Sequence, residues 1–267
     1  KIIKRNNKLY KKFSDHIGVI PLVIISPDDR NLIIEGSETR RKFIDGIICQ
    51  TNKEYLNTLI DYNKTLKQRN ALLKMFYNDS ENIKKTIDIY DNHLSSNAQK
   101  IYERRTEFLS DFIPIFKIRY KQLSDDKENV EIIHKTDISE SQSLYKLLKN
   151  NLEKDLRFQF TTKGIHKDDL TFSINSFSVK KYGSQGQQKT FLIALKLAQF
   201  DYLSKLNSNP ILLLDDIFDK LDDNRVKQII NLVNEEKFNQ IFISDTNKIR
   251  SENIIKKVNK SYKIFEI

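Results

Sequence analysis

The chain has 267 residues, with 46 Lys and Arg against 36 Asp and Glu, a formal net charge of +10, and 39% hydrophobic residues. This hydrophobic content is enough for a sizeable core and excludes a disordered tail. The positive charge favours a polyanionic partner such as nucleic acid, although a lysine-rich surface without that role gives the same balance. A single cysteine, Cys49, excludes an internal disulfide framework and favours a cytoplasmic location. No apolar segment is long enough to span a membrane.

The first fifty residues are expected to form strands and a short helix. Residues 19–25 are an apolar run typical of a buried strand. The sequence SPDD follows, with Ser26 as a candidate N-cap and Pro27 at the first helical position, which predicts a helix start. The first residue is Lys1 rather than Met, so we expect an amino-terminal segment to be absent from this chain.

Residues 51–155 are expected to form an all-helical arm. Apolar residues recur at helical spacing on both sides of the turn-forming sequence YNDSEN, in which Ser80 is a candidate N-cap. Two helices that each bury one apolar stripe predict an antiparallel hairpin, and Pro114 should bend or end the second helix. A further helix is predicted at residues 137–158. A scaffold and a surface for DNA or a partner both remain possible roles for this arm.

Residues 156–267 alternate between strand and helix patterns, which predicts a largely parallel sheet with helices on its faces. The predicted elements begin with a strand, a turn at Gly164 and a further strand. They continue with a helix at 187–206, a strand at 210–215, a helix at 223–237, a strand at 240–245, a helix at 251–260 and a strand at 262–267.

The sequence PILLLDD at 210–216 carries the first chemical signal. Ligands gather at the carboxyl ends of parallel strands, where Asp215 and Asp216 are expected. The first carboxylate suits Mg²⁺, which prefers oxygen ligands, and the second suits the positioning of an attacking water. A pair of acidic residues that caps the following helix explains the same pattern.

The sequence GSQGQQK at 183–189 carries the second signal. A turn with Ser184 and Gly186 at the start of a helix exposes backbone N–H groups at the positive end of the helix dipole. An ordinary helix cap needs the same residues. The direct succession of this turn, a helix and the acidic strand favours a phosphate site. We therefore expect the start of the helix to face solvent and to lie near the point where Asp215 and Asp216 emerge.

Together these motifs resemble a known family. SQGQQ resembles the signature motif of ABC-type ATPases, ILLLDD their Walker B strand, and DKLD their D-loop. SQGQQKTFLIALKLAQ, PILLLDDIFDKLDDNR and GIHKDDL, with SPDD and RRKFID, are jointly similar to the RecF family over residues 26–225. The resemblance implies an α/β fold: part of an ABC-type (P-loop NTPase-like) ATPase head with a parallel-rich sheet, formed by residues 1–50 and 156–267, plus the helical arm. No G-x-x-x-x-G-K-[ST] occurs, and the family's phosphate loop would lie in the absent amino-terminal portion.

The resemblance also implies roles for particular residues. ATP would be held between the phosphate loop of one protomer and the signature turn of another. Asp216 would act as the catalytic base of a slow, DNA-dependent ATPase, and Asp215 would hold Mg²⁺; this chain alone is expected to be inactive. The remaining implied positions are Ser184, Gln185, Gly186 and Gln187 in the signature turn, Asp219 and Asp222 in the D-loop, and Asp245 or Thr246 as the γ-phosphate sensor. His166 matches the family motif GIHKDDL, in which stabilisation of a turn and contact with DNA or nucleotide are both possible.

For the biological role, the resemblance implies ATP-dependent homodimers that bind duplex DNA and single/double-strand junctions in repair, replication, recombination and the SOS response. Partners implied in the same way are RecO, RecR and the recombinase RecA. Two other hypotheses are a structural SMC-like protein, for which this arm is too short, and a transporter ATPase, which has no need for the helical insertion. Basic doublets that could contact phosphates include Arg40 and Arg41, Arg104 and Arg105, and Lys180 and Lys181.

Overall fold

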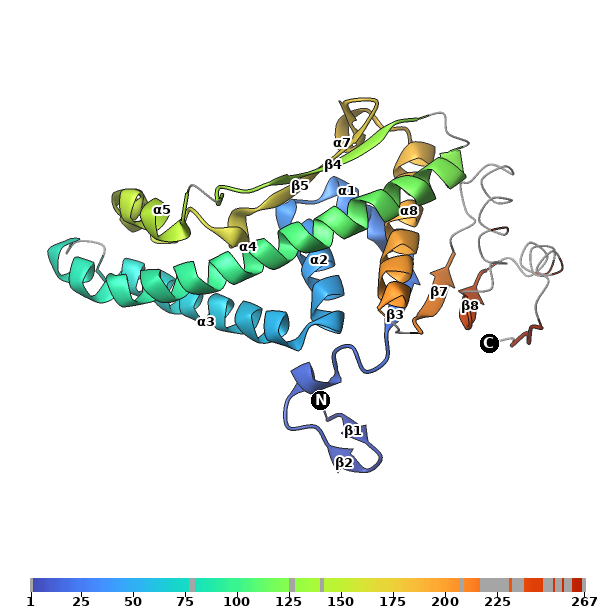
Figure 1. Ribbon diagram of the computed structural model, residues 1–267, viewed down its shortest axis with the longest axis horizontal. Coiled ribbons are helices and arrows are strands. Elements are labelled where there is room, and N and C mark those ends of the chain that lie inside the picture. The colour runs from blue at the N-terminus through green and yellow to red at the C-terminus, as the bar shows by residue number, and fades with distance from the viewer. Residues whose placement is uncertain are drawn as a thin grey trace. The chain divides into compact units, whose positions relative to one another are not determined.

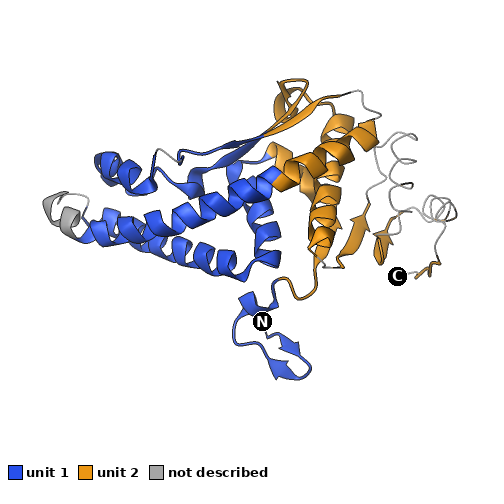
Figure 2. Ribbon diagram, in the orientation of Figure 1, with its two compact units in different colours: residues 1–17, 35–110, 133–171 blue, residues 18–34, 111–132, 172–267 orange. Residues whose placement is uncertain are grey.

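The computed structural model describes residues 2–76, 80–124, 128–139, 142–206, 209–216, 238–246 and 261–265, with the single residues 231, 252 and 256. The chain divides into two compact units, each discontinuous in sequence (Figure 2). Unit 1 comprises residues 1–17, 35–110 and 133–171, and unit 2 comprises residues 18–34, 111–132 and 172–267. The division expected at residues 50 and 155 stays a prediction, because these units are defined by compactness alone.

Unit 1 is built around two long helices, α3 (Lys53–Met75) and the first part of α4 (Ser80–Ser124). Tyr55 near the start of α3 contacts Arg105 late in α4, and Arg69 near the end of α3 contacts Asp91 early in α4. The two helices therefore run antiparallel, which confirms the predicted hairpin (Figure 1). The smaller elements are β1 (Lys4–Arg5), β2 (Lys8–Leu9), η1 (Phe13–His16), α2 (Ser37–Thr51), α5 (Leu144–Asn150), α6 (Leu152–Phe158) and η3 (Ile165–Lys167).

Pro114 does not end α4, which continues for almost three turns to Ser124. A proline inside a helix costs about 3 kcal/mol, because it removes a hydrogen bond and its ring crowds the preceding turn. Phe112, Ile115 and Phe116 beside it are all buried. Burial of such side chains contributes roughly 1.5–3 kcal/mol each, which offsets the cost of the proline.

One strand within the arm was not predicted. β4 (Val130–Lys135) forms a three-stranded sheet with β5 (Asp169–Ile174) and β6 (Phe177–Ser178), in the order β4-β5-β6. Its alternation of buried and exposed residues over six positions is too short to stand out against the helical spacing around it. The turn at Gly164 is confirmed, but the strand expected just before it is absent from the described residues 156–163.

Unit 2 contains the predicted parallel sheet, in the order β3 (Leu22–Ile25), β7 (Ile211–Asp215), β8 (Ile241–Ser244). The long helix α8 (Gln185–Lys205) lies beside β3 (Figure 1). Phe191 on α8 packs against Phe116, Tyr120 and Phe172, with ring centroids 4.7 to 5.8 Å apart. This aromatic cluster is part of the core of the unit. The short helices are η2 (Pro27–Arg30), α1 (Asn31–Ile34) and α7 (Val179–Tyr182).

The start predicted at Ser26 and Pro27 is confirmed, since η2 begins at Pro27 and the Ser26 N–H donates to Asp29 Oδ2 (2.8 Å). The helices predicted at 223–237 and 251–260 fall almost entirely outside the described residues. Residues 261–265 carry no regular secondary structure, so the described part of the expected last strand is not a strand. Among the described helices, none combines the length and apolar character needed to cross a bilayer.

Candidate functional site

The carboxyl edge of the parallel sheet gathers the predicted acidic residues. Asp215 is the last residue of β7 and is paired in register with Ser244, the last residue of β8. The Ser244 hydroxyl donates to Asp215 Oδ1 over 2.5 Å, and the Asp215 side chain remains exposed. Ser244 was not singled out from the sequence. Ser244 could be found only from the strand register, which places it beside Asp215 at the end of the neighbouring parallel strand.

Asp216 lies just beyond the strand in an uncommon backbone conformation. Its φ of 45° is in the left-handed region, which aspartate tolerates better than most residues. The Asp216 N–H donates to the Ser244 carbonyl oxygen (3.1 Å), which fixes this turn against β8. Asp245 and Thr246 follow β8 at the same edge. The structure therefore brings the predicted metal, base and sensor positions together.

The signature turn is an exposed and well-formed helix cap. Ser184 is the N-cap, and α8 begins at Gln185, two residues before the predicted start. Ser184 Oγ accepts from the Gln187 N–H (3.2 Å), and Gln187 Oε1 accepts from the Ser184 N–H (2.8 Å). The N–H groups of Gln185 and Gly186 lie in the first helical turn, where no acceptor inside the helix is in reach. Because Ser184 and Gln185 are exposed, the expectation of a solvent-facing helix start is confirmed.

Two further contacts position this turn. The Gly183 N–H donates to the Val179 carbonyl oxygen (3.0 Å), and a Cβ at Gly183 would come within 2.6 Å of that oxygen, so only glycine fits. Gln187 Nε2 donates to Glu128 Oε1 (2.8 Å), while Glu128 Oε2 accepts from the buried Tyr120 hydroxyl. The contact with Glu128 joins positions 59 apart in the chain, and nothing in the sequence pattern indicates it.

The signature turn and the acidic edge face the same end of unit 2 but are well separated. Lys196, about three turns into α8, forms an ion pair with Asp29 (2.7 Å), and Asp29 lies just after the carboxyl end of β3. Because α8 ends shortly before β7 begins, the helix runs antiparallel to the strands and its first turn lies on the side of their carboxyl ends. Lys196 follows Gln185 by 11 residues, so the first turn extends beyond the carboxyl edge by roughly 16 Å at 1.5 Å per residue. The expectation that the helix start lies near Asp215 and Asp216 is therefore wrong, because α8 is longer than the strands of the sheet. At this separation Ser184 and Asp215 of one chain do not reach the same phosphate group.

The acidic edge fits Mg²⁺ only as part of a larger site. Among the described residues, no group of three or more His, Cys, Asp or Glu side chains is arranged to hold a metal ion. The exposed Asp215 carboxylate would supply one protein ligand to such an ion. Proteins commonly hold Mg²⁺ through one or two carboxylates, with phosphate and water oxygens completing its shell. The predicted D-loop residues Asp219 and Asp222 lie outside the described residues.

Two of the six predicted DNA contacts are corrected by the structure. Arg40 forms a bidentate ion pair with Asp169 (2.7 and 3.1 Å), and Arg105, 1% exposed, bonds Asp45 and Asp168 (both 2.9 Å). Consecutive residues on a helix point about 100° apart, so one member of a doublet readily faces the core. Arg41 is half-buried, and its Nη1 donates to the Asp168 carbonyl oxygen; Arg104, Lys180 and Lys181 are exposed.

The motif GIHKDDL organises the interior of unit 1. Asp168 and Asp169 hold the arginines of α4 and α2, as just described. His166 Nδ1 lies 2.7 Å from the Tyr62 hydroxyl, and Nε2 lies 3.0 Å from the Thr161 carbonyl oxygen. Burial lowers the pKa of His166 to about 4, so the neutral ring accepts from Tyr62 and donates to Thr161. These contacts support the turn-stabilising role for this motif.

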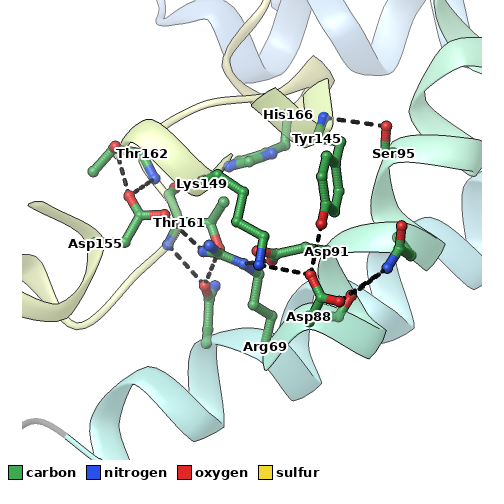
Figure 3. A network of polar contacts seen from close by, with 12 residues as sticks. Arg69, Asp88, Asp91, Ser95, Tyr145, Lys149, Asp155, Thr161, Thr162 and His166 are labelled. Carbon is green, nitrogen blue, oxygen red and sulfur yellow. Dashed lines mark hydrogen bonds and ion pairs between the residues drawn. The ribbon is translucent and has the colours of Figure 1, made fainter. Parts of the chain in front are cut away.

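A second buried network lies in the same unit, around Arg69 (Figure 3). Arg69 bonds Asp91 (2.6 Å), Asp155 (2.7 Å) and the Thr161 hydroxyl (2.9 Å), and all three ionic side chains are fully buried. Asp155 also accepts from the N–H and hydroxyl of Thr162. The network ties α3, α4 and α6 to the segment that leads into the GIHKDDL turn.

We expect the stability of the chain to fall as the pH is lowered from about 6.5 towards 4, in part because of His166. The pKa of its ring is about 4 in the folded chain and near 6.5 in the unfolded chain, so the unfolded state binds the proton first. The contribution is complete above pH 6.5 and amounts to roughly 3 kcal/mol at most, since one pKa unit corresponds to about 1.4 kcal/mol. Urea unfolding between pH 7.5 and 4 measures it. His166→Gln should show a shallower pH dependence than the natural chain, and equal slopes would contradict the assignment.

The parallel sheet with its acidic carboxyl edge, and the capped helix that precedes the acidic strand, define part of a P-loop ATPase head. Two curated relatives named "DNA replication and repair protein RecF" match the whole chain. The one from Flavobacterium johnsoniae is 52% identical over 268 residues, 74% of its own length, and the one from Phocaeicola vulgatus is 46% identical over 269 residues, 71% of its length. The chain belongs to the RecF family.

Solved structures agree with this assignment. "Structure of the recombination mediator protein RecF-ATPrS in RecFOR pathway" matches with a TM-score of 0.81 and 30% identity, over 92% of this chain and 68% of that one. The corresponding RecF-ATP structure matches with a TM-score of 0.79 and 32% identity, over the same shares. No protein-family model matches the chain.

Proposed function

We propose that this chain acts in DNA replication and repair as part of an ATP-dependent DNA-binding head, which pairs with a second protomer through ATP. The observation that carries the proposal is the separation of the exposed signature turn from the acidic edge of its own sheet. A phosphate that reaches Ser184 must then be delivered by another molecule.

The chemistry of the turn suits this role. The N–H groups of Gln185 and Gly186 and the Ser184 hydroxyl lie at the positive end of the dipole of α8, which favours the charge of a γ-phosphate. Gln187 contributes by holding the cap closed. Loss of the γ-phosphate removes negative charge from this contact and weakens the pair, so that ATP acts as a removable link between protomers.

The acidic edge would serve the nucleotide held by the chain's own head. Asp215 is proposed to hold Mg²⁺, which would offset the charge of the phosphates when bound. Asp216 is proposed as the base that orients the attacking water; its short side chain suits slow hydrolysis. Asp245 or Thr246 would sense the γ-phosphate, and Asp219 and Asp222 would line the contact between protomers.

DNA binding is supported by the net charge of +10 and the exposed Arg104, Lys180 and Lys181. The solved relatives are described as recombination mediators of the RecFOR pathway. We accordingly propose a cytoplasmic role at single/double-strand junctions, with RecO and RecR as partners in the loading of RecA.

Two measurements with ATP test the proposal. We expect this chain alone to turn over ATP no faster than buffer, because its 267 residues contain no phosphate-loop motif. Mixed with the full-length Flavobacterium johnsoniae relative, it should form a complex by gel filtration and light scattering with ATP and none without it. Turnover by the chain alone that Asp216→Asn abolishes would show a complete site in one molecule and overturn the shared site.

A further inference from the structure

Directly before the signature turn, unit 2 exposes a pair of aromatic rings. Phe177 in β6 is 64% exposed and Tyr182 at the end of α7 is 71% exposed, with ring centroids 6.0 Å apart and planes at 75°. Aromatic side chains contribute most to a fold when they are buried, so two adjacent rings that face water point to an interaction site.

Basic residues accompany this pair. Lys180 and Lys181 lie between the two rings in sequence, and both are exposed. Residues 170–200 contain four lysines and no Asp or Glu. The positive end of the dipole of α8 lies just after Tyr182. The nearby Glu128 carboxylate is bonded to Gln187 and Tyr120.

The rings are held on rigid supports. Asn175 and Ser176 form the hairpin turn with φ values of 47° and 67°, and Asn175 exchanges two hydrogen bonds with Asn129 (2.7 and 2.9 Å). Val179, which is 1% exposed, holds α7 against the interior. A surface that is already ordered loses little conformational entropy when it binds a ligand.

We propose that this surface, formed by Phe177, Lys180, Lys181 and Tyr182, binds single-stranded DNA. An unpaired base stacks on a ring while the lysines contact the flanking phosphates, the combination by which proteins hold single strands without reading sequence. A blunt duplex does not offer the faces of its internal bases. An acidic protein partner would pair with the lysines but offer nothing to the rings. An apolar protein partner would cover the rings but leave the lysines without a counter-charge. The proposal rests on the DNA-binding role above, and adds where on the chain the single strand is bound.

Tryptophan fluorescence tests the stacking directly, because the natural chain contains no Trp. In Tyr182→Trp the single indole lies at the proposed site, and we expect saturable quenching by oligothymidylate at low salt. Ile89→Trp is the matched control, since Ile89 is a 61% exposed residue on α4 in unit 1 and its indole should not be quenched. Equal quenching at both positions, or no quenching of Tyr182→Trp, would overturn the proposal.

Affinity measurements separate the rings from the lysines. The double variant Phe177→Ala/Tyr182→Ala should bind oligothymidylate about tenfold more weakly or worse and a blunt duplex unchanged, because base stacking is lost. Lys180→Ala/Lys181→Ala should weaken both and lower the slope of log K against log salt by about 1.4 for the single strand. All four residues are at the surface, so circular dichroism should show an unchanged fold.

The association assay with the Flavobacterium johnsoniae relative contains no DNA. A negative result in that assay would therefore contradict the ATP-dependent pairing without contradicting the single-strand site. If the aromatic double variant lost ATP-dependent association but kept its affinity for oligothymidylate, the rings would belong to a protein interface and the single-strand site would be wrong. If the variant kept its ATP-dependent association but lost its affinity for oligothymidylate, the result would support the single-strand site.

Discussion

Ser184→Arg is expected to abolish the ATP-dependent association of this chain with the Flavobacterium johnsoniae relative, with a loss of affinity of at least about 100-fold. The arginine side chain would fill the space in front of the Gln185 and Gly186 N–H groups and hold a triphosphate away from them. The substitution also removes the hydroxyl that accepts from the Gln187 N–H. Loss of such a cap costs about 1 kcal/mol, which weakens the turn but leaves α8 folded, because most of its length is buried.

Titration of a labelled chain with the relative, followed by fluorescence anisotropy with and without ATP, measures this effect. Ser110→Arg is the matched control, an exposed serine on α4 for which we expect unchanged association. Ser184→Thr should also associate, since threonine caps helices in the same way. If Ser184→Arg associated with the natural affinity, the signature turn would not be part of the contact between protomers.

Arg105→Ala is expected to lower the free energy of unfolding by about 3–5 kcal/mol, a large share of the 5–15 kcal/mol typical of a folded chain. The Arg105 guanidinium bonds Asp45, Asp168 and the Ile165 carbonyl oxygen. Its removal leaves the buried Asp168 carboxylate and the largely buried Asp45 carboxylate without the Arg105 charge. Urea unfolding at pH 7.5 measures the loss.

The neighbouring residue provides the control. Arg104 is exposed and pairs with Glu107 on the surface of α4, so Arg104→Ala should change stability by less than about 1 kcal/mol. If Arg105→Ala does not fold at all, Arg105→Lys, which keeps the charge but loses the fork geometry, should be intermediate. Equal stability of the two alanine variants would contradict the buried ion pairs.

How far the sequence predicts the site depends on the distance over which each contact acts. Ser184 and the turn before α8 were predictable because a helix cap is formed by residues three positions apart. Asp215 was predictable because an apolar run that ends in a carboxylate marks the end of a strand. Ser244 and Glu128 were not predictable, because strand register and packing bring them to the site from distant parts of the chain.

The arginines show the same limit of prediction from sequence, here for residues that were wrongly expected to be available to DNA. In the sequence Arg104 and Arg105 form one basic doublet, and Arg40 and Arg41 form another. Only the helix orientation in the fold decides that Arg105 and Arg40 enter the interior, where Asp168 and Asp169 of the GIHKDDL turn accept them. A charged side chain stays buried only with a partner, and these partners come from more than 60 residues further along the chain.

By itself, the sequence determined the parallel sheet, the antiparallel helix pair and the capped turn before α8, because periodicity and capping are local properties of the chain. The tertiary structure decided which charges are available to a ligand, and the ion pair of Lys196 with Asp29 alone places the start of α8 beyond the carboxyl edge of the sheet, by roughly 16 Å at 1.5 Å per residue. That separation follows from a helix longer than the strands it covers, anchored at its middle by Lys196 and Asp29.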